Sequence, residues 1–240
     1  MSTDRRPPTP DAVRLLAEGE VEIEGRLPWS SNASFVVTLC LDGVSGRAVY
    51  KPGRGERALW DFPGGLYRRE IAAYELSSAL GWELVPETVM RWDAPLGEGS
   101  VQRFVDADFA EHYFTLLEHD DLVDQLRVMA AFDLIANNAD RKSGHCLIDA
   151  DRHVWGIDHG LCFHEDPKLR TVMWDFAGEP IPDPLLADIE RVAEDLPEPL
   201  AQYLDADEQA ALRRRAAAVV RLGRYPDPDP NMRPYPWPLV

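Results

Sequence analysis

The sequence lacks long apolar runs and contains few cysteines. No stretch approaches the roughly 20 consecutive apolar residues of a membrane-spanning helix. Residues 1–10 are polar and proline-rich, without an apolar signal region. The cysteines are odd in number and lie inside apolar segments: Cys40, Cys146 and Cys162. This pattern predicts reduced, buried thiols in a cytoplasmic protein and disfavours a disulfide framework.

The common zinc-binding spacings are missing as well. The sequence contains neither a CxxC nor an HExxH motif. The residues that would have to form a structural zinc site are His145, Cys146, His159, Cys162 and His164. Because their spacing does not match the usual ligand pairs, we disfavour this alternative.

Positive charge is scarce. The chain has 25 basic and 42 acidic residues, a net charge of −17, so binding to nucleic acid or to an anionic membrane is not expected. Seven of the 25 basic residues gather in the segments that we assign below to the active-site cleft: Lys51, Arg54, Arg57, Arg68, Arg69, Arg141 and Lys142. A solvated surface accounts for each one singly, and their grouping around the proposed phosphate-binding segments is only mildly informative.

The apolar patterns place strands first and helices second. We expect strands at 21–27, 34–41, 47–51, 87–92 and 99–105. We expect helices at 11–20, 64–80, 109–117, 122–136, 185–196 and 205–222. The 240 residues contain no internal repeats and suffice for two lobes. The sequence thus predicts an α+β fold with a small lobe at 1–105, a large lobe at 106–224 and a proline-rich tail at 225–240.

Two aspartates flank a short predicted hairpin in the second half. Asp140 precedes the apolar runs 146–148 and 154–157, and Asp158 follows them. In phosphoryl transfer one carboxylate orients the attacking hydroxyl while another holds the magnesium that bridges the phosphates. We therefore expect these two carboxylates to lie close together. A surface hairpin with acidic ends is the alternative.

A lysine and a glutamate occur earlier in the chain, in the order of a kinase small lobe. Lys51 ends a predicted strand, where its ammonium group can pair with nucleotide phosphates. Such a lysine needs an anionic partner, and Glu70 on the following helix is the best candidate. Glu75 is the rival, and a solvated surface lysine is the ordinary alternative.

These residues carry a resemblance to known kinases. The series Arg69-Glu70, Ala73, Leu76, Leu80-Gly81 and Val85-Pro86 resembles the small-lobe helix and following strand of HipA-type kinases. Asp140-Arg141-Lys142 resembles the Asp-Arg-His of lipid kinases, and Gly156-Ile157-Asp158-His159-Gly160 resembles their Ile-Asp-Phe-Gly. Over roughly residues 47–163 the chain resembles the atypical kinase group of phosphatidylinositol 3- and 4-kinases and HipA-type toxin kinases.

The resemblance implies a bilobal protein-kinase-like fold with a β-rich small lobe and a helical large lobe. It assigns Lys51 to the α- and β-phosphates of ATP, Glu70 to holding that lysine, Asp140 to the acceptor hydroxyl and Asp158 to Mg²⁺. The backbone of the hinge, Gln102, Arg103, Phe104 and Val105, would pair with adenine. Ser31 and Asn32 belong to the segment that would cover the phosphates. That segment, 30–34, has no glycine, so a plain polar hairpin is an equal alternative.

One position departs from these families. His145 stands five residues after Asp140, where the families place an asparagine that is a second magnesium ligand. Imidazole suits manganese or zinc better than magnesium, so Mn²⁺ becomes a candidate metal. Asn138 is an alternative second ligand. We expect Asp133 to anchor the loop and His159 to pack or form hydrogen bonds.

The sequence therefore predicts an ATP-dependent phosphotransferase that uses Mg²⁺ or Mn²⁺. Its acceptor would be a protein serine or threonine or a small-molecule hydroxyl. The alternative is a nucleotide-binding pseudokinase that regulates a partner, favoured by His145 and by the glycine-free segment. A purely structural or zinc-binding protein is a third, weaker hypothesis.

Overall fold

The computed structural model describes residues 10–27 and 32–239, and the fold is α+β, as the sequence predicts. The chain divides into two compact units. The N-terminal unit comprises Met1–Ile71 and Pro86–Phe104, and the C-terminal unit comprises Ala72–Val85 and Val105–Val240. The division falls inside one helix, after Ile71. The lobe bounds drawn from the sequence stay a prediction.

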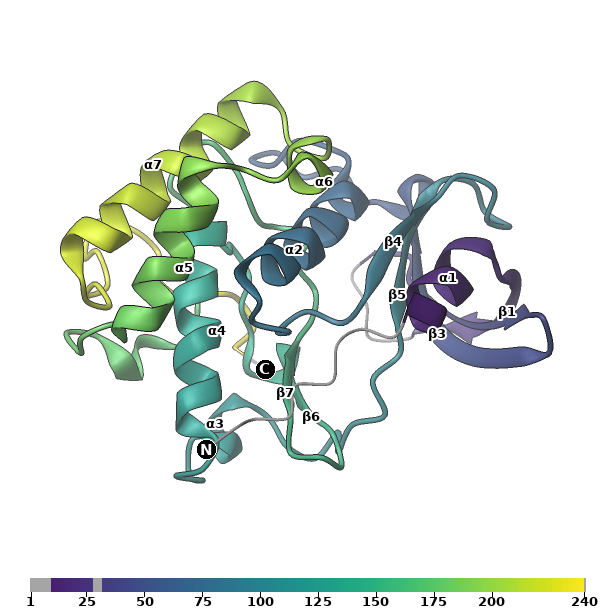
Figure 1. Cartoon of the computed structure of the whole chain (residues 1–240), viewed down its shortest axis with the longest axis horizontal. Helices are drawn as coiled ribbons and strands as arrows, with labels where there is room; N and C mark the ends of the chain where they lie inside the picture. Colours follow the sequence, from purple (N-terminus) through teal and green to yellow (C-terminus); the bar gives the residue numbers. More distant parts are fainter. Residues whose placement is uncertain (1–9, 28–31, 240) are drawn as a thin grey trace. The chain divides into compact units, whose positions relative to one another are not determined.

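The N-terminal unit is built on a five-stranded antiparallel sheet (Figure 1). Its strands are β1 (Glu20–Arg26), β2 (Phe35–Leu41), β3 (Val44–Pro52), β4 (Thr88–Arg91) and β5 (Gly99–Arg103), in the order β1-β2-β3-β5-β4. Helix α1 (Pro10–Glu18) packs against strands β2 to β5. The β2–β3 hairpin closes at Asp42-Gly43, where both residues have positive φ, as an Asp-Gly turn requires.

The core of this unit lies between α1 and the sheet. It contains Leu16, Val37, Leu39, Ala48, Tyr50, Ala94 and Val101. Arg91 secures the helix to β4, because its buried Nη1 donates to the carbonyl oxygens of Leu16 (3.1 Å) and Gly19 (2.8 Å). These carbonyls lie at the C-terminal end of α1, where intrahelical partners run out.

Helix α2 (Leu66–Leu80) has clear signals at both ends. At its start the Glu56 carboxylate accepts the backbone N–H groups of Gly65 and Tyr67, each at 2.8 Å. An acidic group suits this end because the helix dipole is positive there. At its end Gly81 has a φ of +72° and donates to Ser78, so the predicted glycine stop is confirmed.

The C-terminal unit is mainly helical, with one small hairpin. Its helices are α3 (Tyr113–Leu116), α4 (Val123–Ala136), α5 (Asp183–Glu194), α6 (Glu198–Ala201) and α7 (Ala206–Leu222). The hairpin is β6 (Cys146–Ile148) with β7 (Val154–Gly156), and short 3₁₀ turns occur at Ser143–His145 and Trp174–Phe176. Helix α7 packs against α4 and α5.

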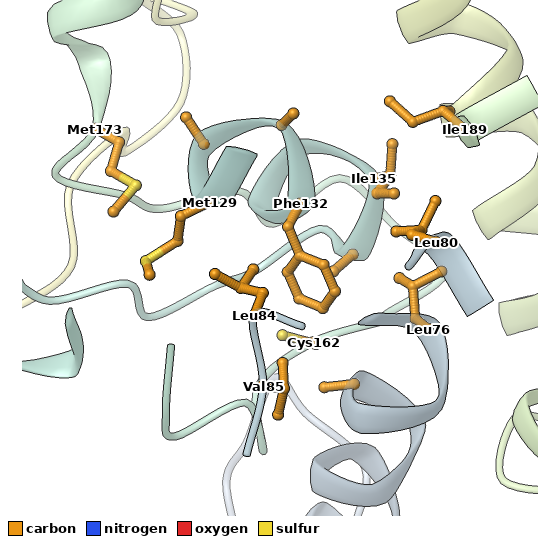
Figure 2. Packing of buried hydrophobic residues seen from close by; sticks show 14 of the residues in the cluster. Leu76, Leu80, Leu84, Val85, Met129, Phe132, Ile135, Cys162, Met173 and Ile189 are labelled. Atoms are coloured by element: carbon orange, nitrogen blue, oxygen red, sulfur yellow. The ribbon is translucent and has the colours of Figure 1, made fainter. Parts of the chain in front are cut away.

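The core of the C-terminal unit surrounds α4 (Figure 2). Met129, Phe132 and Ile135 of this helix are at most 1% exposed and pack with Leu76 and Leu80 of α2. Other members of the same cluster are Leu84, Val85, Cys162, Met173 and Ile189. The loop that carries Asp140 therefore begins at the end of a tightly packed helix.

Several local predictions can be compared with the structure. Asp205 caps α7 through the backbone N–H groups of Asp207 and Glu208, and the Glu208 side chain returns the bond, as the capping-box spacing predicts. The helix predicted at 109–117 is wrong over its first half, since only Tyr113–Leu116 is helical. There the Asp108 side chain accepts the N–H of Ala110 and forms a local turn instead.

The three cysteines are free thiols, but only two of them are buried. Cys146 and Cys162 lie in the core, as expected, whereas Cys40 is exposed on β2, so its predicted burial is wrong. Alternation along the strand explains this, because Leu39 takes the inward position and turns its neighbour outward. Within residues 10–27 and 32–239, no helix combines the length and hydropathy needed to cross a bilayer.

The cap on α2 yields a stability prediction. Glu56→Ala should lower the free energy of unfolding by about 1 kcal/mol, because two backbone N–H groups lose their acceptor. For a chain of this size, the melting temperature should fall by about 2–4 °C. Glu22→Ala, an exposed glutamate on β1, is the matched control and should leave the melting temperature unchanged. Equal melting curves for the two variants would contradict the cap.

Candidate active site

The predicted lysine–glutamate pair is present in the N-terminal unit. Lys51 of β3, opposite Ser100 of β5, donates from its Nζ to the Oε1 of Glu70 on α2. The Glu70 side chain is 3% exposed and the Lys51 side chain 19% exposed, so the ammonium group keeps access to solvent. The pairing with Glu70, rather than with Glu75, is confirmed. The role of the pair in binding phosphates stays a prediction.

The turn after β3 holds this pair in place. The Tyr67 hydroxyl donates to Glu98 at 2.9 Å, and the Tyr67 ring packs over Gly53. A Cβ at Gly53 would approach that ring to 2.8 Å, so the close contact requires glycine. Together with the Glu56 cap, these contacts fix the first turn of α2 against the end of β3. Glu56 was missed from the sequence because a cap ten residues before its helix leaves no local spacing signal.

The predicted phosphate-covering segment is only partly described. Ser31 lies outside the described residues. The Asn32 side-chain oxygen accepts the backbone N–H of Arg57 at 3.0 Å, and Ala33 donates to Gly55 at 3.1 Å. Asn32 therefore ties its segment to the turn after β3, while its contact with a nucleotide stays a prediction.

The predicted hinge follows β5. The Gln102 side chain is buried and donates to Thr88, and the Arg103 side chain pairs with Glu87. The backbone N–H groups of Arg103 and Phe104 donate to Glu87 (2.8 Å) and Arg47 (3.1 Å). Two hinge donors are thus engaged within the unit, and the pairing of the hinge backbone with adenine stays a prediction.

A buried ion pair organises the loop after α4. Asp133 of α4 and Arg141 are fully buried, and the Arg141 Nε and Nη2 atoms contact both oxygens of Asp133 at 2.9–3.2 Å. The Nη1 atom of Arg141 donates to the carbonyl oxygens of Ile157 (3.1 Å) and His145 (3.3 Å). One guanidinium group therefore ties α4, the catalytic loop and the end of the β6–β7 hairpin together. Below we call residues 138–145 the catalytic loop, after the role that the resemblance implies for Asp140.

The remaining contacts of this network agree with the expected anchoring roles. Asn138, which is also fully buried, donates to Asp133 at 2.9 Å and accepts the N–H of Asp140 at 3.0 Å. Both ends of its amide are thus engaged in positioning the loop, and its alternative role as a metal ligand stays a prediction. His159 is buried against Phe132, and its Nε2 lies 2.6 Å from the Arg141 Nη2. Asp133 and His159 are thus structural, as predicted.

Asp140 projects from the loop next to a lysine. The Lys142 Nζ lies 2.6 Å from the Asp140 Oδ2, and about a fifth of each side chain is exposed. Burial raises the pKa of Asp140, Lys142 partly opposes this, and the negative charge of Asp158 raises the pKa further. The carboxylates of Asp140 and Asp158 thus influence each other, as expected for a shared site. A raised pKa brings a carboxylate closer to the range in which a general base works.

Asp158 and His145 face each other at the end of the hairpin. The His145 Nε2 lies 3.4 Å from the Asp158 Oδ2, and the Asp158 side chain is 49% exposed. Asp158 has a φ of +60°, a left-handed conformation that costs a non-glycine residue about 1–3 kcal/mol and recurs at functional sites. The His145 Nδ1 accepts the N–H of Lys142 at 3.5 Å, which assigns the ring proton to Nε2 in this state.

The donors present suit a magnesium ion that is shared with phosphates. Magnesium commonly takes one or two protein carboxylates and fills its other positions with water and phosphate oxygens. The half-exposed carboxylate of Asp158, close to Asp140, fits this pattern. Zinc fits less well, because burial raises the pKa of Cys146 to about 12. Among the described residues, no group of three or more His, Cys, Asp or Glu side chains forms a ready-made metal site.

The buried ion pair yields a prediction. Arg141→Ala leaves Asp133 buried without its partner and should lower the free energy of unfolding by about 3–5 kcal/mol. The matched control is Arg152→Ala, which breaks an ion pair with Asp121 whose side chains are 50% and 62% exposed. That loss should cost at most about 1 kcal/mol. Urea unfolding measures both changes, and a difference below about 1 kcal/mol would contradict the organising role of Arg141.

Comparison with known proteins gives the chain a family. Residues 75–201, more than half of the chain, match the phosphatidylinositol 3- and 4-kinase family. The match contains Asp140, His145 and Asp158 and begins after Lys51 and Glu70. Protein Rv2133c of Mycobacterium tuberculosis (strain ATCC 25618 / H37Rv) is 41% identical over 268 aligned residues, which cover 95% of each chain.

A solved structure is also similar at low identity. The crystal structure of the Helicobacter pylori proinflammatory kinase CtkA shares 12% identity and a TM-score of 0.47, over 88% of this chain and 94% of that one. The family match carries the assignment, and the chain belongs to the phosphatidylinositol 3- and 4-kinase family of atypical kinases.

Proposed function

We propose that this protein is an ATP-dependent phosphotransferase whose acceptor is a hydroxyl group of a protein serine or threonine or of a small molecule. The observation that carries the proposal is the environment of the Asp140 carboxylate. This carboxylate is largely buried, has a raised pKa, and is held beside Lys142 and close to the half-exposed Asp158. In a chain of a kinase family, this combination matches a base next to a metal-binding aspartate.

The residues of the N-terminal unit would bind the nucleotide. Lys51, held by Glu70, would pair with the α- and β-phosphates, since its ammonium group is fixed but still accessible. Ser31 and Asn32 would cover the phosphates. The backbone of the 102–105 hinge would pair with adenine, with Val105 supplying the N–H group. The ordered Lys51–Glu70 pair supports this part of the proposal.

Asp140 would act on the acceptor. Its carboxylate would orient the hydroxyl group and accept its proton while the hydroxyl oxygen forms a bond to the γ-phosphorus. The bond between that phosphorus and the bridging oxygen of ADP breaks, and ADP leaves with the electron pair. Lys142, which is 2.6 Å from Asp140, would steady the carboxylate and favour negative charge on the transferred group.

Asp158 would hold the divalent metal, and His145 would be the second ligand through its Nε2. A metal ion held by these residues would supply positive charge that offsets the negative charge of the phosphates. Binding through Nε2 requires the ring proton to move to Nδ1, at the expense of the long 3.5 Å contact with the Lys142 N–H. Loss of so long a hydrogen bond costs little. The histidine favours Mn²⁺ more than an asparagine would.

The charge of the chain narrows the acceptor class. With a net charge of −17, the protein is repelled by anionic bilayers, so a lipid acceptor is disfavoured despite the family name. The three free thiols suit a reducing compartment, and we place the protein in the cytoplasm, where ATP is present. A pseudokinase that binds ATP and regulates a partner is the second candidate, because His145 replaces the usual asparagine.

The metal assignment yields a prediction. At an ATP–metal concentration about 100 times the dissociation constant, binding should stabilise the fold by roughly 2.7 kcal/mol. This corresponds to a rise in melting temperature of about 5–10 °C. Transfer of labelled phosphate to the protein or to cell extract should be faster with Mn²⁺ than with Mg²⁺. His145→Asn should shift that preference toward Mg²⁺.

Controls separate the two candidates. His153→Asn changes a histidine that binds the backbone of Glu83 in the same unit and should leave the metal preference unchanged. An enzyme transfers label in at least one metal, whereas a pseudokinase shows the melting shift without label transfer. A melting curve that ATP moves in neither metal would contradict both candidates.

The raised pKa of Asp140 yields a second prediction. Because the folded-state pKa lies above the unfolded value, the stability linked to this group is present below the unfolded pKa. It is lost as the pH rises through the folded pKa. Asp140→Asn removes this loss, so the variant should melt at a higher temperature than the wild type above that range. It should also transfer no phosphate.

Melting curves between about pH 4, near the unfolded pKa of an aspartate, and pH 8 measure this effect. The advantage of Asp140→Asn over the wild type should widen with rising pH and then level off. Asp121→Asn, at an exposed carboxylate in the same unit, is the control and should show no such trend. A gap that narrows as the pH rises would contradict the raised pKa.

A further inference from the structure

The segment after α7 returns to the catalytic loop. Its first part is well anchored: Tyr225 is 3% exposed, donates its hydroxyl to the Arg127 carbonyl at 2.8 Å and pairs with Glu179 through its backbone. Between this anchor and residue 239 the described chain forms no helix or strand, and we call residues 231–239 the tail segment. Every contact described below lies within the C-terminal unit.

The tail segment is held mainly through its backbone carbonyls. The Pro234 oxygen accepts the Thr171 N–H at 3.0 Å and the indole N–H of Trp174 at 3.1 Å. The Leu239 oxygen accepts the Ser143 N–H at 2.9 Å. Ser143 belongs to the catalytic loop, three residues after Asp140. We call these three donors the tail seat.

The part of the tail seat that contains Thr171 also contacts the catalytic loop through its backbone. Thr171 forms a parallel bridge with Arg141, and Val172 donates to the Arg141 carbonyl at 3.2 Å. The segment that carries Thr171 and Trp174 follows Asp158 in the chain. The tail segment therefore contacts the two stretches of backbone that follow the proposed base and the proposed metal ligand.

The chemistry of the tail seat matches an extended, proline-containing polypeptide. The seat supplies two backbone N–H groups and one indole N–H, and the tail supplies only carbonyl oxygens. Proline has no N–H but keeps its carbonyl, so a proline-rich chain satisfies such a seat in full. Domains that recognise proline-rich peptides likewise use aromatic-lined grooves for an extended chain. Because the contacts are made to main-chain atoms, they do not require the tail's own sequence.

The tail segment is also held weakly enough to exchange. Met232, Tyr235, Trp237 and Leu239 are 39%, 45%, 77% and 39% exposed, so releasing the segment uncovers little apolar surface. Pro236 is the single buried residue between 231 and 239. Segments with few buried contacts occupy the low end of local stability and open most readily.

From these contacts we propose that the tail seat binds the acceptor polypeptide as an extended, proline-containing segment, and that the tail segment occupies it within the same chain. The inference rests on the proposed phosphotransferase function and selects a protein as the acceptor. The tail segment contains no serine or threonine, and its one hydroxyl belongs to Tyr235. It therefore blocks the seat without offering an aliphatic hydroxyl to Asp140.

The consequence is control by displacement. A tethered segment acts at an effective concentration in the millimolar range, so a peptide at micromolar concentration competes poorly with it. A tail that cannot dock would leave the seat open. A serine or threonine next to the docked stretch of a partner protein would then reach the catalytic loop. Its oxygen receives the phosphoryl group from ATP and its proton passes to Asp140, as in the proposed function.

The test uses the full chain with the buried proline changed. Pro236→Glu places a charge at the buried position and should release the tail segment, while Trp237→Glu adds the same charge at the exposed neighbour. The probe is a fluorescein-labelled peptide that copies residues 229–239, and fluorescence anisotropy measures its binding. We expect the peptide to bind Pro236→Glu at least tenfold more tightly than the wild type or Trp237→Glu. A scrambled peptide should not bind.

A second measurement keeps binding and catalysis apart. Labelling of dephosphorylated casein with ATP and Mn²⁺ should rise several-fold in Pro236→Glu. If the peptide binds but casein is not labelled, the inference that the tail seat binds polypeptide stands and the proposed phosphotransferase function is contradicted. A folded Pro236→Glu variant, verified by its melting curve, that binds peptide no better than the wild type would overturn the inference. If Pro236→Glu does not fold, a chain that ends at Pro230 serves the same binding measurement.

Discussion

The catalytic loop depends on one buried ion pair, Asp133 with Arg141. The guanidinium group has no access to water, and it satisfies its donors with a carboxylate of α4 and with two backbone carbonyls of the β6–β7 region. Burying both charges is expensive, and the geometry is favourable only while every partner is in place. The pair therefore holds the catalytic loop, which carries Asp140, against the end of the hairpin that precedes Asp158. Removing either partner leaves the charge of the other buried without a counter-ion.

The loop and the residue after the β6–β7 hairpin region carry local energetic costs at the positions proposed to react. Asp140 is buried enough for its pKa to rise, and Asp158 adopts a left-handed backbone conformation. Neither feature stabilises the fold, and both are tolerated because the surrounding network determines the chain path. Lys142 partly offsets the cost at Asp140 by its short contact. Stability is thus concentrated in Asp133, Arg141 and the core around α4, while the proposed chemistry lies at their edge.

The residues matched by the family include only part of the candidate active site. The family match covers 75–201 and contains both aspartates, whereas Lys51 and Glu70 lie outside it. Their pairing comes from the geometry of β3 and α2 alone. The roles that we propose for Lys51, Asp140 and Asp158 concern phosphate and metal, so they leave the choice of acceptor open. Our proposal assigns the choice of acceptor to the surface around the loop, where the tail segment lies.

Much of the local structure was determined by the sequence itself. The α+β order of elements, the glycine stop of α2, the capping box of α7 and the hairpin between the two aspartates follow from spacings of a few residues. The Lys51–Glu70 pair was also predicted, because a strand lysine followed by a helix glutamate carries a readable order. Only the tertiary structure decided the rest. Three sets of contacts join residues that are distant in the chain. They are the cap of α2 by Glu56, the hydrogen bond from Arg141 to the Ile157 carbonyl, and the hydrogen bonds from Ser143 and Thr171 to the tail segment. Such contacts are set by packing and main-chain hydrogen bonding, and neither leaves a periodic pattern along the sequence.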